Sequence, residues 1–186
     1  MPSTPERVAL RERGRAARRS IPAEHRQRFD HAIAMDALAC IADAPDGPVA
    51  LYRAYDGEVG TDLVAEGCAR LGRQVVYALH TPRAPLTFVV AERWQTTRFG
   101  LPVPEGPVVD AEQLAVIVVP GTLFDRRGHR IGMGAGAYDR TLPDLPATRL
   151  GLAYECQLID QISAAPWDQP LDLLVTEGGV HTFALR

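Results

Sequence analysis

The chain has 186 residues, of which 46% are hydrophobic and 23% are charged, and its formal net charge is −3 at pH 7. This length predicts a single domain, residues 1–186, with a sizeable core, and the slightly negative charge argues against a general polyanion-binding protein. The sequence contains no run of about 18 apolar residues, so we expect no membrane-spanning helix.

The types of reactive side chain present limit which reaction mechanisms are possible. All 20 basic residues are arginine. This excludes Schiff-base chemistry and a lysine general base, so a phosphate would have to be bound by guanidinium groups, main-chain N–H groups or a metal. The three cysteines, Cys40, Cys68 and Cys156, are scattered and odd in number. Such thiols are typical of a reducing compartment, so we expect a cytoplasmic protein.

Two helices are predicted at the start of the chain. Residues 5–19 begin with a proline behind the N-cap candidate Thr4, and residues 22–42 carry an apolar stripe at helical spacing. The first helix places several arginines on one face, namely Arg7, Arg11, Arg15 and Arg18. From the residues alone we expect this face to be solvated, because no aromatic side chains interleave with the arginines to stack nucleic-acid bases.

Strands and helices then alternate along the chain. Strands are expected at 49–52, 74–79, 86–90, 114–119, 149–154 and 171–176, and helices at 61–71 and 137–142. Residues 93–100 are predicted to form a linking turn, and 157–162 a short helix or turn. This alternation predicts an α/β fold, a three-layer α/β/α sandwich with a mostly parallel, Rossmann-like central sheet.

Glu58 stands at the far end of the loop that follows the strand 49–52. A carboxylate just after the carboxyl end of a parallel strand lies where open α/β sheets bind ligands. It also suits the N-terminal region of the next helix, and the two roles are compatible. Further along, Trp94 and Phe99 could pack over a flat ring system, although such aromatic residues more often anchor a core or a loop.

Three glycines at alternate positions, Gly132, Gly134 and Gly136, follow the apolar strand 114–119. Alternate glycines let a ligand approach the main chain closely, and successive N–H groups can form an anion-binding concavity. The stretch lacks both the Gly-Lys-Ser/Thr ending of a P-loop and the G-x-G-x-x-G spacing of dinucleotide-binding folds. The residues therefore indicate either a phosphate cradle or a turn that packs strand and helix closely.

The residues around the glycines favour an anion. Arg130 and Arg140 place positive charge on either side, and a helix from Ala137 would turn its N-terminus toward the loop. Asp139 could hold the metal that usually accompanies a polyphosphate.

The same stretch closely resembles the signature of the 5-formyltetrahydrofolate cyclo-ligases (methenyltetrahydrofolate synthetases), approximately P-G-x-x-F-D-x-x-G-x-R-L-G-x-G-x-G-Y-Y-D-x-x-L. It is matched from Pro120-Gly121 to Leu142, with Ala137 in place of the first tyrosine. Residues 7–11 are similar to the family's K-x-x-L-R, with Arg7 for lysine. Residues 58–61 look like its E-V/I-x-T, and 167–177 like its W/H-D-x-x-L-D…T-E.

One further segment departs from the family pattern. Val103-Pro104 stands where the family has an acidic residue before proline, after Phe99-Gly100-Leu101.

The resemblance implies an enzyme that converts 5-formyltetrahydrofolate and ATP into 5,10-methenyltetrahydrofolate, ADP and phosphate with the help of magnesium (Mg²⁺). It implies that Arg7 and Arg11 contact ATP and that Glu58 contacts the pterin of the folate. It also implies a magnesium-linked carboxylate at Asp168, in addition to Asp139. Alternatives are a weak or inactive relative that only binds nucleotide or folate, and a nucleic-acid module built on the arginine helix.

The residues and the resemblance together give the following expected sites. The catalytic arginines are Arg7, Arg11, Arg130 and Arg140. The ATP-binding residues are Arg7, Arg11, Arg130, Gly132, Met133, Gly134, Ala135, Gly136, Ala137 and Tyr138. The substrate-binding residues are Arg53, Glu58, Trp94 and Tyr138, and the metal-orienting residues are Asp139 and Asp168. We expect a monomer without nucleic-acid or membrane partners.

Overall fold

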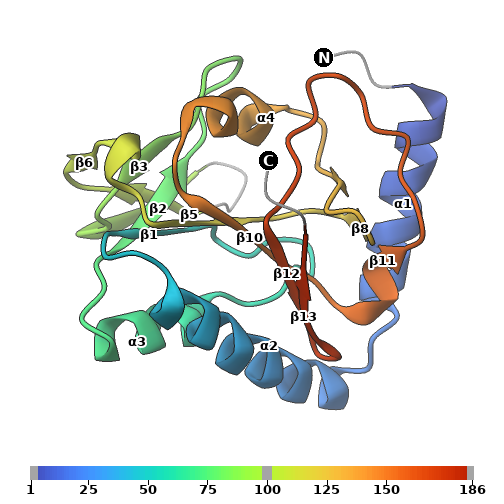
Figure 1. Ribbon diagram of the computed structural model, residues 1–186, viewed down its shortest axis with the longest axis horizontal. Helices are drawn as coiled ribbons and strands as arrows, with labels where there is room; N and C mark the ends of the chain where they lie inside the picture. Colours follow the sequence, from blue (N-terminus) through green and yellow to red (C-terminus); the bar gives the residue numbers. More distant parts are fainter. Residues whose placement is uncertain (1–3, 98–101, 184–186) are drawn as a thin grey trace.

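A computed structural model describes residues 4–97 and 102–183. Its centre is an eight-stranded sheet with the strand order β13-β12-β10-β7-β1-β2-β3-β6 (Figure 1). The strands are β1 Val49–Leu51, β2 Val75–Leu79, β3 Thr87–Val89, β6 Val108–Val109, β7 Val116–Val119, β10 Thr148–Leu152, β12 Leu173–Thr176 and β13 Gly179–Thr182. The strands from β12 to β2 are parallel, whereas the pairs β12–β13, β2–β3 and β3–β6 are antiparallel. The predicted α/β fold with a mostly parallel central sheet is confirmed.

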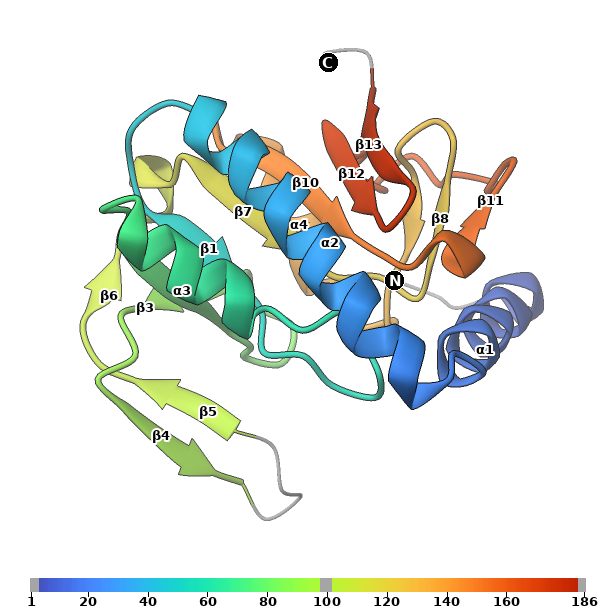
Figure 2. The same ribbon diagram turned by 90° about the horizontal axis from the view of Figure 1, so that it is seen from below.

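Helices cover both faces of this sheet, but the helices on one face are longer than those on the other. The long helices α2 (Ala23–Asp43) and α3 (Asp62–Arg70) lie on one face, where Ile33, Ile41 and Val64 pack against the strands (Figure 2). The other face carries the five-residue helix α4 (Ala137–Thr141) and the short 3₁₀ helices η1 (Ala111–Gln113) and η2 (Leu142–Asp144). All of β7 is buried, because both of its faces are covered.

Helix α1 (Pro5–Arg19), with the predicted bounds, lies across the ends of several strands. It contacts η3 (Glu155–Gln157) and two strands of a small second sheet, β8 (Leu123–Asp125) and β9 (Arg130–Ile131). Gly14 allows this close approach, because a Cβ atom there would lie 2.0 Å from the carbonyl oxygen of Thr122. The packing of α1 therefore brings its arginines next to the segments that follow β7.

The structure also differs from the predictions in three places. Residues 93–96, which were predicted to belong to a linking turn, form β4 (Arg93–Thr96), which pairs with β5 (Pro102–Glu105) in a ribbon that projects from the body (Figure 2). The remainder of that predicted turn, 98–100, lies outside the described residues. The segment 157–162 contributes β11 (Leu158–Ile159) to the small sheet. The main sheet also has a strand that was not predicted, because β13 pairs antiparallel with β12 and forms the edge of the sheet.

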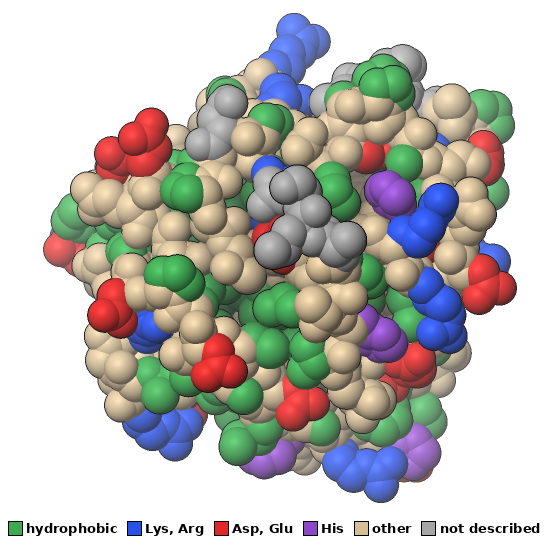
Figure 3. All heavy atoms as spheres, in the orientation of Figure 1, with side chains coloured by type: hydrophobic (Ala, Val, Ile, Leu, Met, Phe, Trp, Pro, Cys, Tyr) green, Lys and Arg blue, Asp and Glu red, His purple; other side chains and the backbone are tan. Residues whose placement is uncertain are grey.

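Among the described residues, no helix combines the length and the apolar character needed to cross a bilayer. On the face drawn in Figure 3, the coloured acidic and basic side chains are interspersed and do not merge into one basic band.

Candidate functional site

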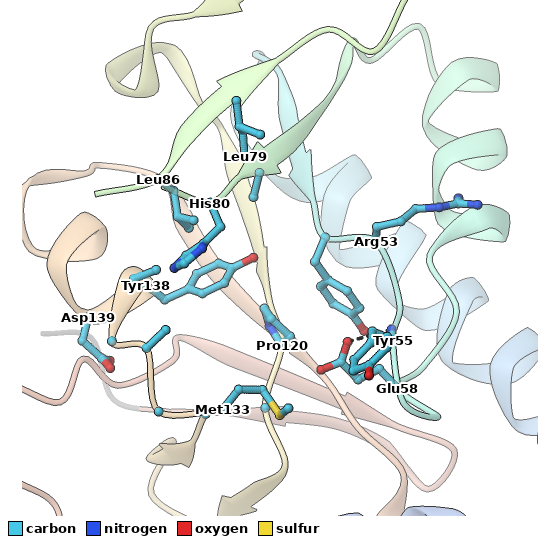
Figure 4. Close-up of a pocket in the computed structure, with 18 of the residues that line it drawn as sticks. Arg53, Tyr55, Glu58, Leu79, His80, Leu86, Pro120, Met133, Tyr138 and Asp139 are labelled. Atoms are coloured by element: carbon cyan, nitrogen blue, oxygen red, sulfur yellow. Dashed lines mark hydrogen bonds between the residues drawn. The ribbon is translucent and has the colours of Figure 1, made fainter. Parts of the chain in front are cut away.

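A cleft of about 910 Å³ opens beside the carboxyl ends of the parallel strands β1, β2 and β7. Tyr52, His80 and Pro120, each of which closely follows one of these strands, line it together with the β9–α4 loop, α1 and part of β5 (Figure 4). Parallel sheets place ligand sites at this edge, and the volume lies at the upper end of the range for small-molecule sites.

The glycine loop, residues 132–136, forms one wall of the cleft between β9 and α4. Gly134 has a φ angle of 102°, and Gly136, the N-cap of α4, has a φ angle of 64°. A Cβ atom on Gly132 would meet no atom within 4 Å, and the atoms nearest to one on Gly134 belong to the Arg11 guanidinium, at 3.4 Å. These two glycines therefore do not serve to pack strand against helix.

Two arginines flank the glycine loop: Arg11 bonds to the loop itself, and Arg130 bonds to Asp139 just beyond it. Arg11 Nε donates to the carbonyl oxygen of Gly132 at 2.8 Å, and burial together with the nearby charge of Arg7 lowers the pKa of Arg11. Arg130 is almost fully buried and donates to Asp139 Oδ1 at 2.8 Å. The guanidinium of Arg130 also lies 6.0 Å from the centre of the Tyr138 ring. Positive charge therefore accompanies the exposed main chain of the loop.

Arg7 and Asp168, which belong to the expected site but lie far apart in the sequence, bind each other. The guanidinium donates to both carboxylate oxygens, at 2.8 and 3.0 Å, and Ala165 N donates a third hydrogen bond to Asp168 at 2.8 Å. Asp168 is only 7% exposed. The pair ties the start of α1 to the segment before β12, along the rim of the cleft.

A double-mutant cycle tests this pair. The substitutions Arg7→Ala and Asp168→Ala are each expected to destabilise the fold, because each leaves a desolvated partner behind, and their coupling in the free energy of unfolding should be about 2 kcal/mol. Urea denaturation of the parent, both single variants and the double variant measures it. Strictly additive effects would show that the ion pair contributes nothing to stability.

Asp139 offers a better position for a metal than Asp168 does. Its Oδ1 accepts from Arg130 and, at 3.4 Å, from Gln169 N, whereas both Asp168 oxygens already accept from Arg7. No group of three or more His, Cys, Asp or Glu side chains within residues 4–97 and 102–183 could hold an ion unaided. Mg²⁺ does not require such a group, because it often binds to one or two carboxylates and the phosphates of the substrate.

Glu58 faces the cleft on the side opposite Tyr138, with Pro120 between them (Figure 4). Its Oε2 accepts from Tyr55 N at 3.1 Å, and its Oε1 lies 3.8 Å from Arg18 NH1. Burial raises the pKa of Glu58 to about 7, although the hydrogen bond from Tyr55 N and the charge of Arg18 act in the other direction. The carboxylate is thus an acceptor that burial keeps poorly hydrated, and a ligand with N–H donors could satisfy it.

The remaining expected site residues lie in different environments. Tyr138 projects into the cleft, and burial followed by the charge of Glu58 raises its pKa. The residues Met133, Ala135 and Ala137 also line the cleft. Arg53 lines the cleft as well, but its guanidinium extends away from it to pair with Asp62 (Figure 4). Arg140 does not line the cleft but donates to the carbonyl oxygens of Ala135 and Ala84, at 2.9 and 3.4 Å.

Trp94 lies on the ribbon outside the residues that line the cleft, and it is 41% exposed. Its ring stacks edge-on against Tyr77, with 4.8 Å between the ring centres, and the Arg53 guanidinium lies 5.2 Å away. Phe99, the other aromatic residue considered for a flat ligand, falls outside the described residues, as do Gly100 and Leu101. The apolar pair Val103-Pro104 does line the cleft.

The predicted solvation of Arg15 and Arg18 is wrong. Arg18 is fully buried and Arg15 is 27% exposed, and both donate to the carboxylate of Asp56. His80 was not recognised from the sequence, although it immediately follows a parallel strand and its ring lies beside Tyr138 in Figure 4. The rule that pointed to Glu58, a polar residue after a parallel strand, would also have pointed to His80.

Comparisons with known proteins agree on one family. A model of the 5-formyltetrahydrofolate cyclo-ligase family matches residues 3–177. The 5-formyltetrahydrofolate cyclo-ligase of Haemophilus influenzae is 28% identical over 185 residues, which cover 93% of this chain and 99% of the relative. The Escherichia coli enzyme of the same name is 28% identical over 179 residues, 89% of this chain and 97% of that one.

Solved structures show the same fold. The NMR structure of Aquifex aeolicus 5,10-methenyltetrahydrofolate synthetase matches with a TM-score of 0.78 at 26% identity and covers 97% of this chain and 94% of its own. The Mycoplasma pneumoniae protein of that name matches with a TM-score of 0.76 at 23% identity, over 92% of this chain and 99% of its own.

Proposed function

Because the chain belongs to the 5-formyltetrahydrofolate cyclo-ligase family, we propose that its cleft binds ATP and 5-formyltetrahydrofolate side by side and transfers a phosphoryl group between them. The observation that carries this proposal is the arrangement of the cleft. A main-chain cradle flanked by Arg11 and Arg130 forms one wall, and the buried acceptor Glu58 lies on the other side.

The triphosphate belongs at the glycine loop. Gly132 leaves open space where a side chain would otherwise stand, and Gly134 lets the Arg11 guanidinium lie close against the loop. Arg130 is held by Asp139, so its charge is fixed in place without having to reorganise when the phosphates arrive. Arg7 reaches the same end of the cleft from α1, although it must share its guanidinium with Asp168.

The folate belongs at the other end. The pterin ring presents N–H donors, which match the two oxygens of Glu58. The apolar residues Leu79, Leu86 and Val103 line the same cleft and suit the flat faces of an aromatic ring system. Tyr138 lies between this end and the glycine loop, where it would contact the substrate near the reacting atoms.

The chemistry follows from the weakness of the formyl group as an electrophile. The formyl oxygen attacks the γ-phosphorus of ATP, and the bond between that phosphorus and the bridging oxygen breaks to release ADP. The resulting imidate phosphate is electrophilic at carbon. N10 then forms the new C–N bond and loses its proton, while the formyl oxygen leaves as part of inorganic phosphate. No protein nucleophile is needed.

The residues of this chain therefore act by positioning and by charge. Arg11 and Arg130 would stabilise the charge on the transferring phosphoryl group, and the loop N–H groups would hold its oxygens in line with the formyl oxygen. A magnesium ion would neutralise part of the triphosphate charge, with Asp139 as the carboxylate that holds it and Asp168 acting mainly through Arg7.

Purified protein with ATP, Mg²⁺ and 5-formyltetrahydrofolate tests the proposal directly. We expect ADP to be released only when the folate is present, the methenyl product to appear by its ultraviolet absorbance in equal amount, and turnover to stop when Mg²⁺ is chelated. The chain departs from the family pattern at Arg7, Val103 and Ala137. Tight binding of both ligands without any product would instead identify a binding protein, and ATP hydrolysis independent of folate would contradict the proposal.

A further inference from the structure

Arg18 is a fully buried cation beneath the folate end of the cleft. It lies on α1, and its guanidinium reaches two segments that follow parallel strands. Its Nε donates to the carbonyl oxygen of Asp56 at 2.7 Å and its NH2 to the Asp56 carboxylate at 3.1 Å. Its NH1 lies 3.5 Å from the carbonyl oxygen of Gly121 and 3.8 Å from Glu58 Oε1. The same group thus contacts the loop that carries Glu58 and the segment after β7.

The loop around Asp56, to which Arg18 donates hydrogen bonds, has an unusual conformation. Asp56 has a φ angle of 52°, which a residue other than glycine seldom adopts, and Gly57 follows with a φ angle of 77°. Arg15 and Arg19 also donate to the Asp56 carboxylate, and Arg26 donates to the carbonyl oxygen of Gly57 at 3.0 Å. Such a left-handed turn persists where its surroundings fix it, so the position of Glu58 depends on this arginine cluster.

Arg18 differs from the other arginines of the cluster in what it faces. Arg19 is 58% exposed and contacts only the Asp56 carboxylate, whereas Arg18 is 0% exposed and points its NH1 toward Glu58. A charge that is screened by water has little effect on a neighbour, but a buried cation 3.8 Å from a carboxylate favours the ionised form. Arg18 can therefore control both where Glu58 lies and whether it is charged.

We propose that Arg18 is a positioning residue for folate recognition, which holds the Glu58 loop in its left-handed turn and places a buried positive charge beside the Glu58 carboxylate, the acceptor for the pterin N–H groups. This inference rests on the proposed function, because it takes Glu58 to be the folate contact. It adds a residue that does not line the cleft and so does not touch the substrate.

The groups around Glu58 define what a pH experiment can report. Tyr55 N and Arg18 favour the charged form, while burial and the neighbouring carboxylate of Asp56 favour the neutral one. Tyr52 and Tyr138 also face Glu58, but burial keeps the pKa of both phenols above the ordinary tyrosine value, so they stay neutral between pH 6 and 9. Asp56 stays charged in that range, because its arginine partners outweigh its burial and lower its pKa to about 2.

The experiment measures the dissociation constant of 5-formyltetrahydrofolate from pH 6 to 9, by titration calorimetry without ATP. In the parent, affinity should rise with pH through a midpoint near 7, where Glu58 loses its proton. In Arg18→Met the midpoint should move up by about one pH unit, because an opposite charge at this range lowers a carboxyl pKa by about 1 to 3 units. Affinity at pH 7 should then fall about five-fold, and the two proteins should converge toward pH 9.

Matched variants separate charge from support of the fold. Arg19→Ala removes another partner of Asp56 that does not face Glu58, and it should keep the parent midpoint. Arg18→Lys keeps the charge and should also keep that midpoint, even if binding weakens. Arg18→Gln removes the charge but retains hydrogen-bond donors for the Asp56 and Gly121 carbonyl oxygens, so it tests the proposal if Arg18→Met does not fold. Circular dichroism checks the folded state of each variant.

The outcomes distinguish a wrong role for Arg18 from a wrong assignment of Glu58 as the folate contact. The inference is wrong if Arg18→Met and Arg18→Gln lose the same factor in folate affinity at pH 6 and at pH 9, or if they keep the parent midpoint. In either case Arg18 would only support the loop and would not affect the charge of Glu58. An equal midpoint shift in Arg19→Ala would also overturn it. If the parent binds no folate, or Glu58→Gln binds it as well as the parent does, the assignment of the folate site fails first. Agreement between Glu58→Gln and the double variant Arg18→Gln/Glu58→Gln would support the proposal.

Discussion

Substituting valine for Gly134 is expected to abolish ATP-dependent turnover and to leave binding of 5-formyltetrahydrofolate nearly intact. A φ angle of 102° strains any branched side chain, and the new Cβ atom would lie 3.4 Å from the guanidinium of Arg11. Arg11 and the loop main chain would both shift. Because a misplacement of about 1 Å can lower a rate about 100-fold, we expect kcat/KM for ATP to fall by at least about that factor.

A control with the same backbone strain makes this result interpretable. Gly72 has a φ angle of 70° in the turn after α3, and a Cβ atom there would meet no atom within 4 Å. Gly72→Val should therefore lose about 1–3 kcal/mol of folding free energy while keeping the parent KM for ATP. Initial rates over a range of ATP concentrations, with thermal melts of each variant, give both quantities. Turnover by Gly134→Val at the parent rate would contradict the assignment of the phosphate site to the glycine loop.

The sequence was informative wherever one short segment carries a feature. Helix α1 was predicted with its observed bounds, because its N-cap Thr4 and the proline behind it are local signals. The glycine loop and Glu58 were found for a similar reason, since the alternate glycines form a local pattern and Glu58 lies in the loop that follows the parallel strand β1. A segment whose role is set by its immediate neighbours can be interpreted without a structure.

Features that depend on distant segments were missed. Arg18 sits on a face that looked solvated, and it is buried only because the loop around Asp56 folds back onto α1. Arg7 and Asp168 are 161 positions apart, so nothing in the sequence shows that they neutralise each other. The β4–β5 pairing was likewise missed, because neither segment was predicted as a strand from its own residues.

The same contacts give α1 a role at both ends of the cleft. Its first turns carry Arg7 and Arg11 to the glycine loop, and its last turn carries Arg18 to the folate end. One rigid helix thus fixes the distance between the two predicted subsites. This explains why many arginines of a protein with a net charge of −3 are gathered on one short segment. They are structural partners of internal acceptors more than a surface for a polyanion.

Glu58→Gln is expected to do the reverse of Gly134→Val, by raising KM for 5-formyltetrahydrofolate about 30- to 1,000-fold with little change in ATP affinity. The amide removes the charge and turns a donor toward the pterin N–H groups, and the loss of one well-placed charged contact commonly costs about 2–4 kcal/mol. Steady-state kinetics with each substrate varied in turn measure it. A variant with the parent KM for folate would contradict the assignment of Glu58.

The same variant should be more stable than the parent, but only at higher pH. The pKa of Glu58 is raised from 4.5 to about 7 in the folded protein. Below about pH 4.5 the carboxyl is protonated in both states, and between 4.5 and 7 only the folded state keeps the proton, so the free energy of unfolding falls as pH rises. Above pH 7 the loss of folding free energy is constant at about 3 kcal/mol, because each pKa unit corresponds to about 1.4 kcal/mol.

Glutamine never ionises. Urea denaturation should therefore show that Glu58→Gln is more stable than the parent at pH 8 and differs little from it at pH 4.5. An equal difference in stability at both pH values would contradict the idea that the buried charge of Glu58 destabilises the folded protein. If the charge does destabilise the fold, the retention of an acid at position 58 indicates that this acid contributes to ligand binding.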